Sequence, residues 1–187
     1  MKTTLFTIFF LISFVSFGQN EVLSDKKLYE KAEAYTLALN SNEISDLPTE
    51  EDKLKMQNVK DITNYAFENA YKNYQLLIAN YPSSEYFVIA LYQSGEMELG
   101  MKKYDESKKS LSKIFEIESK WEYYKRKAKI YLAYIAAEEK DYKKALAYLK
   151  ESEKYKKPSM SCRVENERDE NLLKSIHEKC DKGLSGK

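Results

Sequence analysis

The stretch from Ala90 to Ser119 reads ALYQSGEMELGMKKYDESKKSLSKIFEIES, and its small and apolar residues recur at helical spacing. The inner face of a first helix carries Leu91, Ser94, Gly95 and Glu98. After a short turn at Lys102 and Lys103, the inner face of a second helix carries Tyr104, Ser107, Leu111, Ile114 and Phe115. Antiparallel helices approach closely only where side chains are small, as at Gly95 and Ser107. The stretch therefore predicts a tightly packed helical hairpin, with Tyr104 filling the space beside the small residues.

The hairpin pattern recurs downstream, between Ala128 and Pro158. Matched residues stand 38 positions apart: Gly95 and Ala133, Tyr104 and Tyr142, Ser107 and Ala145. Prolines and glycines fall mostly between the predicted helices, as expected for residues that end helices. The body of the chain therefore predicts repeated helical hairpins.

A looser copy of the hairpin lies upstream. Its first helix contains Leu28, Tyr29, Ala32 and Tyr35. Its second helix ends before Pro82 and contains Ala70, Tyr74, Leu77 and Ile78. An insertion at about residues 40–58 separates the two helices. Within it, Thr49 is followed by three acidic residues, which predicts a helix with Thr49 as its N-cap.

Helical hairpins with small residues at fixed offsets resemble the tetratricopeptide repeat, a unit of about 34 residues. Consensus positions of that family are matched by Leu91, Gly95, Tyr104, Ser107, Leu111 and Ile114, and in the next repeat by Ala128, Ala133, Tyr142, Ala145 and Leu149. The resemblance implies an all-α fold, with three hairpins over residues 19–158 in a right-handed α-solenoid and a loop with a capping helix over 159–187. Two features depart from the family: Glu98 replaces an aromatic residue, and the connection at 117–127 is about four residues longer.

The composition argues against two classes of protein. Five glycines and three prolines among 187 residues are too few for an all-β protein with many tight turns. Lys and Arg total 31 against 30 Asp and Glu, and Lys2 is the only charged residue before Glu21. The chain beyond that point is electrically balanced. This argues against nucleic acid as a partner, because phosphate binding needs a cationic surplus.

Residues 1–18 predict an export signal. Lys2 precedes the apolar run Leu5–Phe17, which is long enough for a signal peptide and short for a membrane span of about 20 residues. Small residues at Ser16 and Gly18 predict cleavage after Gly18 or one residue later; the alternative is a retained membrane anchor. No cysteine stands near that site for lipid attachment. We expect an exported, periplasmic protein whose mature chain has no transmembrane span.

After Pro158 the composition turns polar, and we expect a loop over 159–168 followed by a helix from Asp169 to Asp181 with Gly183 as its C-cap. The apolar side of this helix carries Leu172, Leu173, Ile176 and Cys180. A repeat stack exposes its last apolar face, so the helix is predicted to cover that face. In an oxidising compartment Cys162 and Cys180 can form a disulfide if the chain folds back between them; two separate thiols are the alternative.

No set of residues predicts catalysis. His177, the single histidine, has no clear Ser or Cys partner and no second metal ligand nearby, and the chain has no glycine-rich phosphate loop. We therefore expect no enzyme activity, no cofactor and no metal. A hydrolase with an unrecognised site that uses His177 is the alternative.

In the tetratricopeptide family the first helix of each hairpin lines a concave groove. The resemblance implies these groove residues: Tyr29, Glu33, Tyr92, Glu96, Leu99, Lys127, Ile130, Tyr134 and Glu138. Tyrosine combines a rigid apolar surface with a hydroxyl group, which suits peptide recognition. The alternative for Tyr92 and Tyr134 is that they pack between repeats.

The stretch from Tyr71 to Phe115 also resembles repeats of exported bacterial envelope proteins. The expected function is a non-catalytic scaffold or adaptor of the bacterial cell envelope that binds a protein or peptide. The alternative is an accessory subunit of an outer-membrane or envelope assembly complex, bound through its convex or terminal surface. Trp121, in the long connection, is expected to be a wedge between repeats or else a contact in such an assembly. The pattern carries no signal for the oligomeric state.

Overall fold

The structure, a computed structural model, describes residues 23–57, 61–156 and 163–186. These residues form eight α-helices and three short 3-10 helices, and no β-strand occurs among them. The α-helices are α1 (Asp25–Ser41), α2 (Glu50–Gln57), α3 (Ile62–Asn80), α4 (Phe87–Gly100), α5 (Tyr104–Lys113), α6 (Glu122–Glu138), α7 (Tyr142–Ser152) and α8 (Arg163–Leu184). The 3-10 helices are η1 (Ile44–Asp46), η2 (Ile114–Glu116) and η3 (Ser119–Trp121). The all-α prediction is confirmed.

The predicted export signal at 1–18 lies outside the described residues. Within the described ranges, none of the helices combines the length and the apolar composition that crossing a membrane requires.

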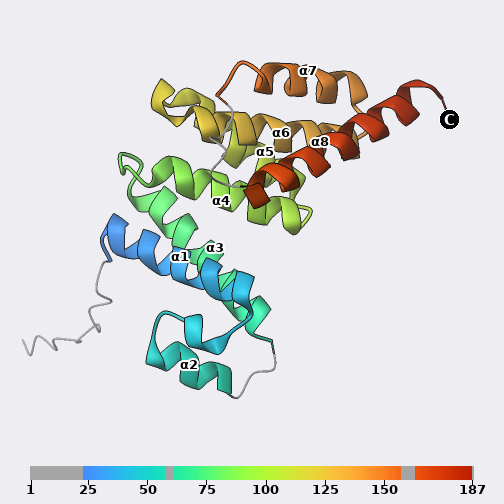
Figure 1. The fold of residues 1–187 in the computed structure, drawn as a ribbon. Coiled ribbons are helices and arrows are strands. Elements are labelled where there is room, and N and C mark those ends of the chain that lie inside the picture. Colours follow the sequence, from blue (N-terminus) through green and yellow to red (C-terminus); the bar gives the residue numbers. More distant parts are fainter. Residues whose placement is uncertain (1–22, 58–60, 157–162, 187) are drawn as a thin grey trace, which may run out of the picture.

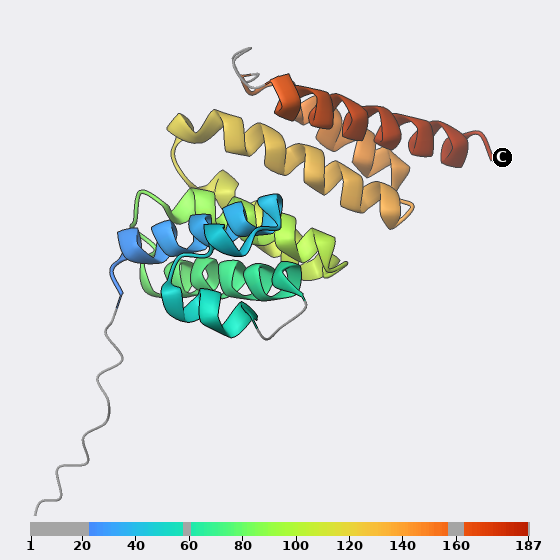
Figure 2. The ribbon, with the colours of Figure 1, turned by 60° about the horizontal axis from the view of Figure 1, so that its bottom comes forward.

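The helices pack as pairs that follow one another in chain order (Figure 1). α1 packs mainly on α3, α4 on α5, and α6 on α7. Successive pairs meet through α3 with α4 and through α5 with α6. The last helix, α8, lies against α6 and α7, as Figure 2 shows from another side.

The α4–α5 pair is closest where Gly95 faces Leu111. A Cβ atom on Gly95 would lie 2.7 Å from Leu111 Cδ2, far inside van der Waals contact, and Leu111 is fully buried. The buried hydroxyl of Ser107 donates a hydrogen bond of 2.7 Å to the Gly95 carbonyl. Small residues at these two positions therefore let the helices touch, as the sequence predicts.

Turns with the same backbone path end α4 and α6. Lys102 and Lys140 adopt left-handed conformations, with φ of 59° and 64°. The amide of Lys103 reaches back to the carbonyl of Glu98 at 2.9 Å, and the corresponding bond after α6 is 2.8 Å. Such a bond defines the Schellman end of a helix. The two lysines stand 38 residues apart, so this turn recurs at the same spacing as the side-chain pattern.

Glu98, which departs from the family pattern, is a buried carboxylate that joins three helices. The residue is only 3% exposed. Tyr71 and Gln75 of α3 donate hydrogen bonds of 3.0 and 3.3 Å to one of its oxygens, and Ser110 of α5 donates one of 2.8 Å to the other. A buried carboxylate is tolerated when it is hydrogen-bonded in this way. An aromatic residue here would leave three donors without their acceptor.

The predicted insertion forms η1 and α2 between the paired helices α1 and α3. Its N-cap is confirmed, since the Asp52 amide donates to Thr49 Oγ1 at 3.1 Å. The buried Asp52 carboxylate also accepts hydrogen bonds from Thr49 Oγ1 at 2.6 Å and from Tyr65 OH of α3 at 2.5 Å. Burial alone would raise the pKa of Asp52, but the hydrogen bonds from Thr49, Tyr65 and Tyr35 outweigh it and lower that pKa. Asp52 therefore anchors α2 on the first helix pair.

α8 is longer than the helix that the sequence predicts. It begins at Arg163, so the loop predicted over 159–168 is wrong for its second half; residues 159–162 lie outside the described residues. The stretch from Arg163 to Arg168 is polar but rich in glutamate and arginine, which are good helix formers. Polarity alone is thus a poor indicator of a loop here.

At its other end α8 packs on α7 through a glycine. The helix continues to Leu184, so Gly183 lies inside it and is not the predicted C-cap. A Cβ atom on Gly183 would lie 2.0 Å from the ring of Tyr142, which occupies the space that a side chain would need. Nearby, Ile176 and Cys180 are buried in a core cluster with residues of α6 and α7. α8 therefore covers the apolar face of the last helix pair.

The predicted disulfide involves Cys162, which lies outside the described residues. Cys180 is a free, buried thiol. α8 is continuous from Arg163 to Cys180, a length of roughly 25 Å. This is several times the Cα separation that a disulfide allows. The two thiols can pair only if the first turns of α8 unwind, and the pairing stays a prediction under that condition.

Gly95→Val should destabilise the chain, because the added methyl groups collide with Leu111. Overpacking of a close-packed core costs about 1–3 kcal/mol, measurable by urea unfolding followed with circular dichroism. Gly100→Ala is the matched control, because no atom lies within 4 Å of its added Cβ. That variant should be as stable as the native chain, or more stable by up to about 1 kcal/mol. Equal stability of the two variants would contradict the close approach of α4 and α5.

The pH dependence of stability should contain a contribution from Asp52. Its lowered folded-state pKa means that the carboxylate stabilises the fold fully above its unfolded pKa of about 3.9 and loses this effect as the pH falls through the folded value. Asp52→Asn should therefore be less stable than the native chain at pH 7 and show a smaller further loss between pH 5 and pH 3. Urea unfolding across that range measures both. Glu50→Gln, at an exposed carboxylate of the same helix, should follow the native profile.

Cys180 should resist thiol reagents until the chain unfolds. Burial, helped by the charge of Asp181, raises the pKa of its thiol, and the reagent cannot reach it in the folded chain. In a Cys162→Ser variant, a chromogenic disulfide reagent at pH 8 should react about 100-fold more slowly with the folded chain than with the urea-unfolded chain. A native chain that is about two daltons lighter without reductant would reveal the disulfide and an unwound start of α8.

Candidate binding groove

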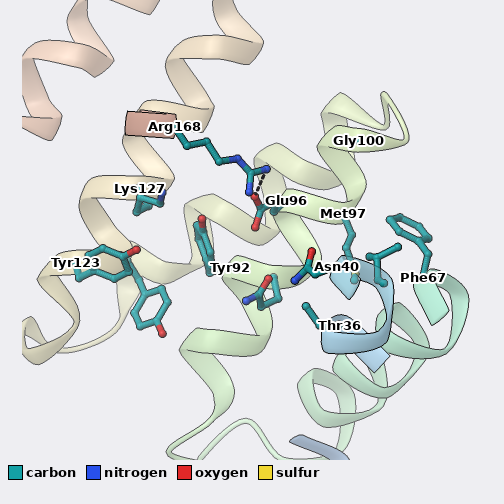
Figure 3. Close-up of a pocket in the computed structure, with 13 residues that line it drawn as sticks. Thr36, Asn40, Phe67, Tyr92, Glu96, Met97, Gly100, Tyr123, Lys127 and Arg168 are labelled. Atoms are coloured by element: carbon teal, nitrogen blue, oxygen red, sulfur yellow. Dashed lines mark ion pairs between the residues drawn. The ribbon is translucent and has the colours of Figure 1, made fainter. Parts of the chain in front are cut away.

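A hollow of about 350 Å³ lies between the helix pairs (Figure 3). Side chains from five helices line it, including Asn40 of α1, Phe67 of α3, Tyr92 and Glu96 of α4, Lys127 of α6 and Arg168 of α8. Figure 3 shows Arg168 extending from α8 toward Glu96, with Asn40 on the opposite side of the hollow. Residues far apart in the sequence therefore meet at one place.

A second hollow, of about 560 Å³, adjoins the first between α4, α6 and α8. Its walls are mainly apolar and aromatic and include Leu99, Tyr104, Tyr131, Tyr134 and Leu172. Lys102, in the left-handed turn after α4, lies on its rim. Glu96, Gly100 and Arg168 line both hollows. We call the two hollows together the concave groove.

Glu96 ends a chain of hydrogen bonds that begins in the core. Tyr131 OH donates to its carboxylate at 2.6 Å, and Tyr92 OH donates to Tyr131 OH at 3.2 Å. The rings of Tyr92 and Tyr131 are stacked, with centroids 5.7 Å apart and planes inclined by 10°. Burial, followed by the negative charge of Glu96, raises the pKa of Tyr131 above its usual value. The hydroxyl group therefore stays protonated and holds the Glu96 carboxylate in place.

Arg168 crosses the concave groove to reach the same carboxylate. Its Nη2 lies 3.2 Å from Glu96 Oε1. The side chain of Arg168 is 74% exposed, and that of Glu96 is 25% exposed. The contact stands where the two hollows adjoin, because both residues line both of them. It is thus an ion pair across the middle of the groove, exposed at its Arg168 end and partly buried at its Glu96 end.

Two other ion pairs fix α8 on α6. Lys127 and Asp169 form a pair in which both side chains are at most 10% exposed. Further along, Lys179 pairs with Glu138 and lies over the ring of Tyr134, 5.8 Å from its centroid. The hydrogen bond from Lys179 is the main reason why the pKa of Glu138 is lowered. Burial, together with the hydrogen bond to Glu138, raises the pKa of Tyr134 to about 12.

Most of the predicted groove residues of α4 and α6 come together. Tyr92, Glu96, Leu99, Lys127 and Tyr134 line the concave groove. Glu138 lies beside Tyr134 at a smaller hollow against α8. Tyr92 is only 6% exposed, so it serves both core packing and the groove wall.

Like Glu138, the predicted groove residues Tyr29, Glu33 and Ile130 line neither hollow. Tyr29 stacks on Tyr86, with ring centroids 4.4 Å apart, and Glu33 accepts a hydrogen bond from Tyr74 of α3. Ile130 is 1% exposed and lies in the core cluster that includes residues of α8. Ile130 therefore does not line the concave groove, because α8 covers that part of α6.

Sequence reasoning missed two residues that shape the groove. Arg168 falls in the predicted loop. Tyr131 was missed because the family positions, carried over from Tyr92 at the 38-residue offset, fall on its neighbour Ile130. Asp169 is a sequence signal for the contact of α8 with another helix. It stands three residues before Leu172 and so lies on the same face of α8 as the apolar side chains. A carboxylate on an apolar stripe requires a buried partner, and Lys127 is that partner.

Trp121 lines a third hollow, of about 340 Å³, beside the connection between α3 and α4. Its neighbours there include Pro82, Phe87 and Val88. The side chain is half-buried against the main core cluster, and its ring lies 5.9 Å from that of Tyr124. Trp121 therefore packs between elements, as a wedge would, and still lines a surface hollow.

The remaining candidates for chemistry stay apart. His177 is exposed on α8. Among the described residues, no three His, Cys, Asp or Glu side chains are grouped so that they could hold a metal ion. Comparisons of the chain with protein-family models, with curated protein sequences and with solved structures found no match.

Proposed function

We propose that this chain is a non-catalytic scaffold that binds an extended protein or peptide segment in the concave groove. The observation that carries the proposal is the pair of adjoining hollows, of about 350 and 560 Å³, with tyrosines of α4 and α6 in their walls. Tyrosine and arginine are the residues that most often anchor protein interfaces, because they combine a large apolar surface with hydrogen-bonding groups. Both are present here.

The repeat features support a tetratricopeptide-like solenoid as the framework of this groove. The pairs α4–α5 and α6–α7 end their first helices with the same left-handed turn at Lys102 and Lys140. The close approach at Gly95 matches the small side chain of Ala133 in the next pair. In this interpretation α1, α4 and α6 are the first helices of their hairpins and face the groove.

The proposed location is the bacterial cell envelope, and the proposal rests on the apolar run Leu5–Phe17 behind Lys2. The absence of enzyme activity is part of the same proposal. Its support is that His177 is exposed and that the residues of the groove include no nucleophile paired with a base.

An accessory subunit held through another surface is the second candidate function. The observation that favours it is the hollow at Trp121, which is about 340 Å³ and lies apart from the concave groove residues. A half-buried tryptophan beside Pro82 and Phe87 offers an apolar contact surface to a partner. In that case Trp121→Ala would weaken the association more than any change in the groove.

Selection from a random peptide display library tests the groove directly. Asn40 is exposed on the rim of the first hollow, so Asn40→Trp should fill it without disturbing the core. Lys109→Trp is the matched control, because Lys109 is exposed on α5 and lines neither hollow. Peptides selected on the native chain should bind the control equally and bind Asn40→Trp at least about tenfold more weakly, a loss of about 1.4 kcal/mol.

Selected peptides that bind Asn40→Trp as well as the native chain would contradict the groove assignment. If Trp121→Ala alone released them, the second candidate function would replace the first. Both results are measured by fluorescence polarisation with the same labelled peptides.

A further inference from the structure

We infer that the segment bound in the concave groove carries a lysine or arginine side chain, and that this side chain replaces Arg168 on Glu96. The inference rests on the proposed function and names the chemistry of its partner. It is argued from the state of Glu96, from the exposure of Arg168 and from the charges that line the groove.

The Glu96 carboxylate is already arranged to receive a cation. Tyr131 OH holds it at 2.6 Å, and the stacked ring of Tyr92 holds Tyr131. The carboxylate side chain is 25% exposed, so a group from solvent can reach it. A fixed carboxylate beside aromatic rings favours guanidinium and ammonium groups, which bind both.

Arg168 shows that a guanidinium group fits at this place. Its side chain is 74% exposed and contacts Glu96 at 3.2 Å. An ion pair whose basic group is so exposed contributes little to stability, because water competes for the guanidinium group and the long side chain loses freedom. A basic side chain of a partner can therefore take over the contact at small cost, while Arg168 turns outward into solvent.

Departure of the Arg168 side chain would leave α8 in place. The Lys127–Asp169 pair is buried, and Ile176 and Cys180 lie in the core cluster. These contacts do not involve Arg168. Because Glu96 and Arg168 line both hollows, turning Arg168 outward would join them into one open path. An extended segment could then lie along the path with its basic side chain at Glu96.

The charges of the groove leave one carboxylate for a basic side chain of a partner once Arg168 turns outward. The charged residues that line the two hollows are Glu96, Asp169, Lys102, Lys127 and Arg168. Lys127 and Asp169 neutralise each other, and Lys102 on the rim acts electrostatically on Glu138. Once Arg168 leaves, Glu96 is the lining carboxylate without a paired cation. An acidic segment would instead keep Arg168 on Glu96 and leave the groove divided.

Two peptide pools test the inference. They have random flanking residues and a fixed phenylalanine, and differ only in the next residue, which is arginine in one pool and glutamate in the other. By fluorescence polarisation, the arginine pool should bind the native chain more tightly than the glutamate pool. Glu96→Gln should weaken its binding at least about tenfold, because a charge-assisted hydrogen bond is lost while Gln can still accept from Tyr131. Arg168→Gln should tighten binding about two- to fivefold by removing the internal competitor.

Lys108→Gln and Glu139→Gln are the matched controls. They remove the same charges from an ion pair whose residues line neither hollow, and they should leave the affinity of the arginine pool unchanged. Melting curves of all four variants show whether α8 stays docked.

Tighter binding of the glutamate pool, or weaker binding to Arg168→Gln, would overturn the inference. Peptides that Asn40→Trp excludes but that prefer glutamate would overturn it while leaving the groove function intact. Peptides that Asn40→Trp does not exclude would overturn the groove function itself.

Discussion

The buried ion pair between Lys127 of α6 and Asp169 of α8 determines where the last helix lies, and the concave groove depends on that position. Both side chains are nearly inaccessible to water. Removing one partner of such a pair costs about 3–5 kcal/mol, because the other charge is left buried and unpaired. Apolar residues such as Ile176 supply the buried area of this interface, whereas the ion pair favours one register of α8 along α6, because a shifted register would leave two buried charges unpaired. That register brings Arg168 and Leu172 into the walls of the groove.

Hydrogen bonds between tyrosine and carboxylate join helices at several places and involve four of the 16 tyrosines of the chain. The pairs are Tyr65 with Asp52, Tyr71 with Glu98, Tyr74 with Glu33 and Tyr131 with Glu96. In each pair the apolar ring fills space between helices, and the hydroxyl group donates a hydrogen bond to the carboxylate. This bond offsets the free-energy cost of removing the carboxylate from water. Tyrosine therefore serves the packing of the helices first, and of these four residues Tyr131 also lines the concave groove.

The sequence predicts the helices where apolar spacing is regular and fails where polar contacts decide. The hairpin at Ala90–Ser119, the small residue at Gly95 and the N-cap at Thr49 follow from spacing and local chemistry, and the structure has all three. The start of α8 does not follow, because its first turns carry few apolar residues. In the groove, Tyr92 and Glu96 are predictable from the resemblance to the tetratricopeptide repeat. Arg168 is not, because its place depends on how a helix distant in sequence docks.

Hydrogen exchange with and without a saturating library-selected peptide tests the central claim, that docking of α8 on α6 completes a binding groove. Bound peptide should slow amide exchange in α4 and α6 and in the first half of α8, because these helices share the walls of the two hollows. The connection between α3 and α4, beside Trp121, should be unaffected. Slowing confined to that connection, with α4, α6 and α8 unchanged, would contradict the account.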